Sequence, residues 1–167
     1  IKPGDKIVIP AFTFIATSSI PRLLGAKIII SDVDPKTFNM TPTILEKIVK
    51  KTKVKAVIIV DVGGLSTDLD KFLELSKKYR FILIEDAAEA LGSEYKKRKI
   101  GSFNHTTIFS FHIAKQITTV EGGCISTGIK KIHENVIRIK NHGRLNNQDN
   151  EHRILGTNFR TTDIQSA

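Results

Sequence analysis

Short apolar runs rich in β-branched residues alternate along this chain with stretches of helical periodicity. Strands of a parallel sheet are buried on both faces, so they read as short apolar runs, and a crossover helix separates each from the next. The pattern therefore predicts an α/β domain with a mainly parallel sheet and crossover helices. The expected strands are residues 6–9, 26–31, 56–61, 81–85, 106–111 and 123–126, and the expected helices are residues 13–24, 41–50, 68–79 and 129–140.

Two of the expected helices carry start signals. Thr41 followed by Pro42 is typical of an N-cap with proline in the first turn, and Asp68 with Asp70 places acids at a helix start. Residues 156–167 read as a loop that enters a helix, which the end of the chain interrupts. We therefore expect a longer natural protein, of which this chain is a fragment lacking both ends.

The formal charge of +9 raises the question of a nucleic-acid or membrane partner. The basic residues are scattered, and the densest runs, residues 50–53 and 96–99, fall in expected loops, where such runs are usually solvated surface. The single cysteine, Cys124, cannot form an internal disulfide, which fits a cytoplasmic protein. No apolar stretch approaches the ~20 residues of a membrane-spanning helix. We expect neither nucleic acid nor membrane as a partner.

Two acids end one of the expected strands. The apolar run closes with Glu85 and Asp86, and the small residues Ala87 and Ala88 follow. Ligands of open α/β sheets bind beyond the carboxyl ends of the strands, which places Asp86 to meet one. A buried carboxylate there needs a cationic partner, such as a protonated pyridinium nitrogen. Asp86 could instead cap a following helix, and taken alone this is the more common arrangement.

A lysine follows the next expected strand. Ser110 stands near the end of that strand, Lys115 comes five residues later, and Gly122 and Gly123 lie beyond it. A lysine that forms an imine must spend part of its time unprotonated. Ser110 could donate a hydrogen bond to a phosphate, and the glycines let the backbone pass close to a ligand. A lone lysine after a strand is usually a surface residue, so its position alone does not select Lys115.

Taken together, these segments resemble a known family. They are residues 4–17 (GDKIVIPAFTFIAT), 32–34, 85–88, 101–103, 109–111 with Lys115, 121–123, 141–143 and 156–160. The series is similar, over essentially the whole chain, to the DegT-type (DegT/DnrJ/EryC/StrS) pyridoxal-phosphate-dependent sugar-nucleotide aminotransferases. The resemblance implies the large domain of the aspartate aminotransferase-like fold, known as fold type I. The stretch around Lys115 most resembles members that act at C4 of 6-deoxy sugar nucleotides.

The resemblance also implies roles for single residues. Lys115 would bond covalently to the cofactor, pyridoxal 5′-phosphate, and later shuttle a proton, while Asp86 would pair with the ring nitrogen. Ser110 would bind the cofactor phosphate. Phe14 would stack on the ring, although it could equally pack in the core. Asn158 would reach the phosphate site of a neighbouring subunit, which implies a homodimer; no metal site is expected.

The chain departs from the family at several points. Glu89 stands where Gln or His often donates a hydrogen bond to the ring hydroxyl oxygen; an ionised Glu cannot donate, so Glu89 is either protonated or points elsewhere. Asp61 stands where His is frequent. Members also carry an upstream phosphate-binding segment and a C-terminal small domain. We therefore expect residues 1–167 to be a partial cofactor-binding domain that binds the cofactor weakly or not at all by itself.

The expected reaction is transfer of an amino group from an amino acid such as glutamate to a nucleotide-linked keto sugar. In dehydratases of the same fold, histidine replaces the imine lysine, so Lys115 argues against that activity. A basic nucleic-acid-binding module would need interleaved aromatics or a basic helix. A dinucleotide-dependent oxidoreductase would need G-x-G-x-x-G after an early strand. A truncated or degenerate homologue without activity remains an alternative, and neither the sugar nor the donor is fixed.

Overall fold

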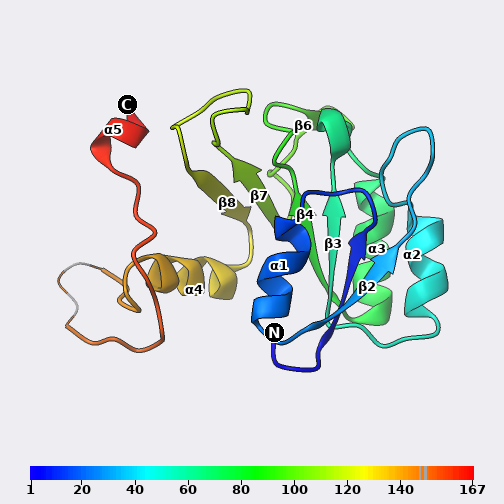
Figure 1. Ribbon diagram of the computed structural model, residues 1–167, viewed down its shortest axis with the longest axis horizontal. Helices are drawn as coiled ribbons and strands as arrows, with labels where there is room; N and C mark the ends of the chain where they lie inside the picture. Colours follow the sequence, from blue (N-terminus) through cyan, green and yellow to red (C-terminus); the bar gives the residue numbers. More distant parts are fainter. Residues whose placement is uncertain (147, 149) are drawn as a thin grey trace.

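A six-stranded sheet forms the centre of the structure, a computed structural model that describes residues 1–146, 148 and 150–167. Its strands are β1 (Lys6–Pro10), β2 (Lys27–Ser31), β3 (Ala56–Val60), β4 (Ile82–Asp86), β7 (Thr106–Ser110) and β8 (Gly123–Thr127), in the order β2-β1-β3-β4-β7-β8. The first five strands pair in parallel, and β8 runs antiparallel to β7 (Figure 1). The expected mainly parallel sheet is confirmed, and each strand lies within about one residue of its predicted ends.

Helices cover both faces of the sheet. α1 (Ala16–Leu23) covers one face, and α2 (Pro42–Val49) and α3 (Leu69–Tyr79) cover the other. α4 (Lys130–Lys140) follows β8, and the short α5 (Asp163–Ser166), which lies apart from the sheet in Figure 1, confirms the helix expected in the last segment. The prediction missed a 3-10 turn, η1 (Val62–Gly64), and a hairpin of β5 (Glu94–Tyr95) and β6 (Arg98–Lys99). It also began the first helix at residue 13, whereas residues 11–15 form the loop between β1 and α1.

Alternation along the strands divides the core between the two faces. Val57 and Ile59 of β3 pack with Leu45 of α2 and with Leu69 and Phe72 of α3, and all of these are buried. The neighbouring side chains, including Ile7, Ile9, Ala56 and Ile58, form a smaller cluster on the opposite face. Successive residues of a strand point to opposite faces, so α1 and the α2–α3 pair cover different sides of the sheet.

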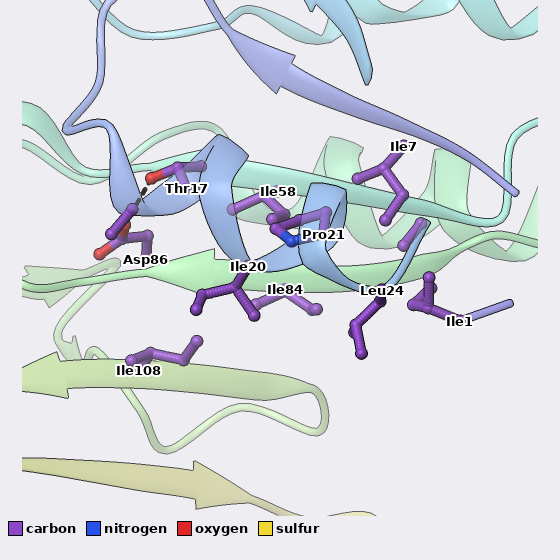
Figure 2. Close-up of a pocket in the computed structure, with 12 residues that line it drawn as sticks. Ile1, Ile7, Thr17, Ile20, Pro21, Leu24, Ile58, Ile84, Asp86 and Ile108 are labelled. Carbon is purple, nitrogen blue, oxygen red and sulfur yellow. Dashed lines mark hydrogen bonds between the residues drawn. The ribbon is translucent and has the colours of Figure 1, made fainter. Parts of the chain in front are cut away.

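The α1 side is only partly covered. A mostly apolar hollow of about 370 Å³ lies between α1 and the sheet, and Figure 2 shows Ile20 and Pro21 of α1 facing Ile58, Ile84 and Ile108. Isoleucines of this face remain exposed near the sheet's edge. Asp86 lies at one end of this hollow, so the open face leads to the carboxyl ends of the strands.

The start of α2 follows the predicted cap. Thr41 has extended backbone, its side chain accepts a hydrogen bond from the Ile44 N–H at 3.3 Å, and Pro42 occupies the first turn. We expect Thr41→Ala to lower the free energy of unfolding by about 1 kcal/mol, because one N–H of the first turn loses its acceptor. Urea denaturation measures the change. Thr43→Ala, an exposed substitution in the same turn, is the control, and an equal loss in both variants would contradict the cap.

The basic runs lie on the surface, as predicted. Lys96 and Lys97 form the turn of the β5–β6 hairpin, where Lys96 pairs with Asp70 at 2.6 Å. Lys50 and Lys51 follow α2 and are exposed. In the part of the chain that the structure describes, no helix combines the length and apolar character needed to cross a bilayer.

Candidate active site

A cavity of about 300 Å³ opens at the carboxyl-end edge of the sheet. Its walls come from segments at the carboxyl ends of four parallel strands: the loop after β1, the ends of β3 and β4, and the loop after β7. Its lining residues are Phe12, Thr13, Phe14, Val60, Val62, Asp86, Ala88, Glu89 and Lys115. The cavity thus lies where open parallel sheets bind their ligands, and it brings Asp86 and Lys115, separate in sequence, to one space.

Asp86 presents its carboxylate to this cavity from the last position of β4. Its Oδ1 accepts the Ala88 N–H at 3.1 Å and its Oδ2 accepts the Thr17 hydroxyl at 3.3 Å, a contact drawn in Figure 2. Turns rather than a helix follow β4, so the alternative that Asp86 caps a helix is wrong, and it caps a turn instead. Among the described residues no Lys, Arg or His pairs with it. Each oxygen keeps an acceptor position, which fits a cationic ligand atom.

Lys115 and Glu89 face each other across the cavity. The Lys115 Nζ lies 3.9 Å from Glu89 Oε1, and the lysine side chain is only 22% exposed. Glu89 Oε2 accepts the Gly63 N–H at 2.8 Å, and the Glu89 carbonyl accepts the Gln116 amide. The Glu89 carboxylate therefore accepts the Gly63 N–H while it lines the cavity beside Lys115, and its relation to a ring hydroxyl stays a prediction.

The other expected site residues differ in their placement. Phe14 lines the cavity and is 76% exposed, which excludes packing in the core of this chain. Ser110 ends β7, beside the strand that carries Asp86, but it does not line the cavity, and its Oγ accepts the His112 N–H. Asn158 also lies outside the cavity, in a bridge with Asn141. Their phosphate-binding roles stay predictions.

Sequence reasoning assigned no role to several residues that complete the site. Thr17 donates to Asp86 across 69 positions of sequence, and its hydroxyl lies 2.8 Å from that of Thr13. Val60 and Val62 form an apolar wall. Thr17 stands inside the segment that carried the family resemblance, yet only the packing of α1 on the sheet reveals that it orients the carboxylate.

Comparison with known proteins agrees with this geometry. The sequence profile described as the DegT/DnrJ/EryC1/StrS aminotransferase family matches residues 1–167. The chain belongs to this family. It is 36% identical over 167 residues to GDP-perosamine synthase of Caulobacter vibrioides, covering 100% of this chain and 45% of that protein. It is 38% identical over 168 residues to UDP-4-amino-4,6-dideoxy-N-acetyl-beta-L-altrosamine transaminase of Campylobacter jejuni. This match covers 98% of this chain and 44% of that protein.

Solved structures of aminotransferases share the fold. An aminotransferase from Psychrobacter cryohalolentis superposes with a TM-score of 0.91 at 32% identity, over 99% of this chain and 45% of that one. PseC of Helicobacter pylori, an aminotransferase involved in the biosynthesis of pseudoaminic acid, superposes with a TM-score of 0.90 at 31% identity. The match covers 98% of this chain and 44% of that one. These matches confirm the aminotransferase fold. The chain spans slightly less than half the length of the relatives it matches.

Proposed function

We propose that this chain supplies the cofactor-binding part of a pyridoxal-phosphate-dependent sugar-nucleotide aminotransferase. The reaction is transfer of an amino group from an amino acid such as glutamate to the C4 carbonyl of a nucleotide-linked 6-deoxy sugar. The observation that carries the proposal is the cavity that holds Asp86 and Lys115 together with the exposed ring of Phe14. The relatives' names support the substrate class, since one is a GDP-perosamine synthase and another acts on a UDP-linked 4-amino sugar.

When bound, pyridoxal phosphate supplies an electron sink for the charge that develops on the substrate carbon. Asp86 would hold a proton on the ring nitrogen through its carboxylate. The Lys115 amine would hold the cofactor covalently, and its Nζ would accept and return a proton beside the substrate carbon. Phe14 would cover one face of the ring and exclude water. Ser110 accepts one backbone N–H, and its own hydroxyl proton is free to bind a phosphate oxygen.

Asn158 fits a site shared between two subunits. It is exposed, it lies outside the cavity of its own chain, and the segment around it is tied to α4 through the Asn141 bridge. A second copy of the chain could therefore receive this residue at its cofactor phosphate. We infer a homodimer for the complete protein, in which each subunit completes the other's site.

The test uses the complete gene product loaded with pyridoxal phosphate, with glutamate and a GDP- or UDP-linked 4-keto-6-deoxy sugar. We expect 2-oxoglutarate and a sugar nucleotide with an amine at C4, identified by mass spectrometry and NMR. A nitrogen-free product that has lost a hydroxyl would instead support the dehydratase alternative. No turnover of either keto sugar by cofactor-loaded protein would contradict the substrate class, and failure to load cofactor would support the degenerate alternative.

A further inference from the structure

A buried polar cluster lies on the other side of β4 from the cavity. Adjacent residues of a strand face opposite sides, so Glu85 points toward α3 while Asp86 points into the cavity. Asp61, Glu85, His105 and Thr107 are each between 0% and 3% exposed. Charged and polar side chains are rarely buried to this degree without partners, so their hydrogen bonds need accounting.

Some polar atoms of this cluster have hydrogen-bond partners and others do not: within the described residues, His105 Nδ1 and Thr67 Oγ1 at its margins have none, nor do two carboxylate oxygens at its centre. Glu85 Oε2 accepts the Thr107 hydroxyl at 2.7 Å and lies 3.1 Å from His105 Nε2. Asp61 Oδ1 accepts the Thr67 N–H at 3.0 Å. Asp61 Oδ2 and Glu85 Oε1 are buried and, within the described chain, have no hydrogen-bond donor while both carboxylates are ionised. Asp61 and Glu85 lie on the same face of neighbouring strands and interact with each other. Two such buried carboxylates disfavour double ionisation, and one proton between them would satisfy both oxygens.

We propose that Asp61 and Glu85 share one proton and act as positioning residues for the candidate active site. The proton resides on Asp61 Oδ2 and is donated to Glu85 Oε1. The cluster then holds one negative charge, on Glu85, and the His105 Nε2–H and the Thr107 hydroxyl donate to it. Every central oxygen gains a partner, with no further ion required.

The electrostatic environment supports this arrangement. Burial raises the pKa of Asp61 to about 8, and the charges of Glu85 and Asp86 act in the same direction, while the Thr67 N–H opposes them. The titratable groups facing Asp61 are Glu85 and Asp86 on β4, with His105 on the far side of Glu85. The raised pKa therefore favours the protonated form of Asp61.

Asp61 is joined to the cavity walls through the backbone. Its N–H donates to the Asp86 carbonyl at 3.1 Å, and its side chain closes the turn to Thr67. Its neighbours in sequence, Val60 and Val62, line the cavity. The shared proton thus fixes the main chain on either side of Asp61, which is hydrogen-bonded to the Asp86 carbonyl. The positioning role rests on the proposed function, whereas the proton sharing does not.

Asp61→Asn in the complete gene product tests the proton. The Asn side chain can donate an N–H to Glu85 but cannot ionise. Asp61, by contrast, binds its proton more tightly in the folded protein than in the unfolded chain, because its pKa is raised on folding. Stability from this group is therefore full below about pH 4 and is lost as pH rises toward about pH 8. The urea midpoint of the wild type should fall across this range more steeply than that of Asp61→Asn. The exposed control Asp32→Asn should keep the wild-type slope.

Infrared spectroscopy at pH 7 gives a second measurement, whose first result comes from the wild type alone. We expect the band of a buried protonated carboxyl in the wild type and in Asp32→Asn, and its loss in Asp61→Asn. Absence of this band from the wild type, or equal pH slopes for the wild type and Asp61→Asn, would overturn the shared proton.

Cofactor retention tests the positioning role. Asp61→Ala leaves Glu85 buried without its donor, so we expect pyridoxal phosphate to bind about tenfold more weakly, whereas Asp61→Asn should bind within about threefold of the wild type. Equal retention in Asp61→Ala and the wild type would overturn the positioning role. Failure of the wild type itself to retain cofactor would overturn the proposed function, and the infrared and urea results would still decide the proton sharing.

Discussion

Lys115→Ala is expected to abolish covalent attachment of pyridoxal phosphate and to lower kcat by a factor of about 10³ or more. Lys115 is the lysine that lines the cavity with Asp86, and its amine is held near Glu89 with little exposure to solvent. Alanine removes both the group that bonds the cofactor and the group that carries the proton. Borohydride reduction followed by peptide mapping locates the attachment in the wild type, and steady-state kinetics measure the loss.

Two further variants separate chemistry from folding and charge. Lys115→Arg keeps a positive charge opposite Glu89 but cannot form the same covalent bond, so it should be as inactive as Lys115→Ala. Lys47→Ala removes an exposed lysine of α2 and should keep wild-type labelling and turnover. A label on any lysine other than Lys115 would show that the catalytic assignment is wrong.

The strands of this fold could be predicted because local sequence determines them. A buried parallel strand must be apolar on both faces, so apolar runs such as residues 56–60 can be recognised as strands without knowing what packs beside them. The direction of β8 could not be predicted in the same way. Its length and composition resemble those of the other strands, and only its pairing with β7 makes it antiparallel. The β5–β6 hairpin was missed because its strands are two residues each and polar.

In the candidate site too, residues within recognisable local motifs could be predicted, whereas residues defined by tertiary packing could not. Asp86 and Lys115 could be named because the motifs around them resemble those of a known family, and both stand at or soon after the ends of recognisable strands, whose carboxyl ends meet at one edge of a parallel sheet. The roles of Thr17 and of the partners of Asp61 could not be predicted, because their contacts depend on how distant segments pack. Glu85 reads in the sequence as another acid at a strand end, and only its burial with Asp61 and His105 distinguishes it.

Asp86→Asn is the second substitution with a large expected effect, a fall in kcat of about 10³, which corresponds to about 4 kcal/mol of transition-state stabilisation. Asn can still accept the Ala88 N–H through Oδ1, and its amide can donate to the Thr17 oxygen. The local fold should therefore persist. A neutral amide cannot hold a proton on a ring nitrogen, so the loss falls on turnover more than on folding. Steady-state kinetics measure kcat, cofactor titration measures the affinity for pyridoxal phosphate, and circular dichroism measures folding.

Thr17→Val provides a graded comparison for the same carboxylate. It removes one neutral hydrogen bond of 3.3 Å and leaves the charge of Asp86 in place. We expect a loss of about 1 kcal/mol, or roughly fivefold in kcat, because the carboxylate loses one of the two donors that orient it. If Asp86→Asn instead matched Thr17→Val, the charge would contribute little beyond orientation. Asp86 would then serve to close the turn at Ala88, and the cationic partner would have to be sought elsewhere in the cavity.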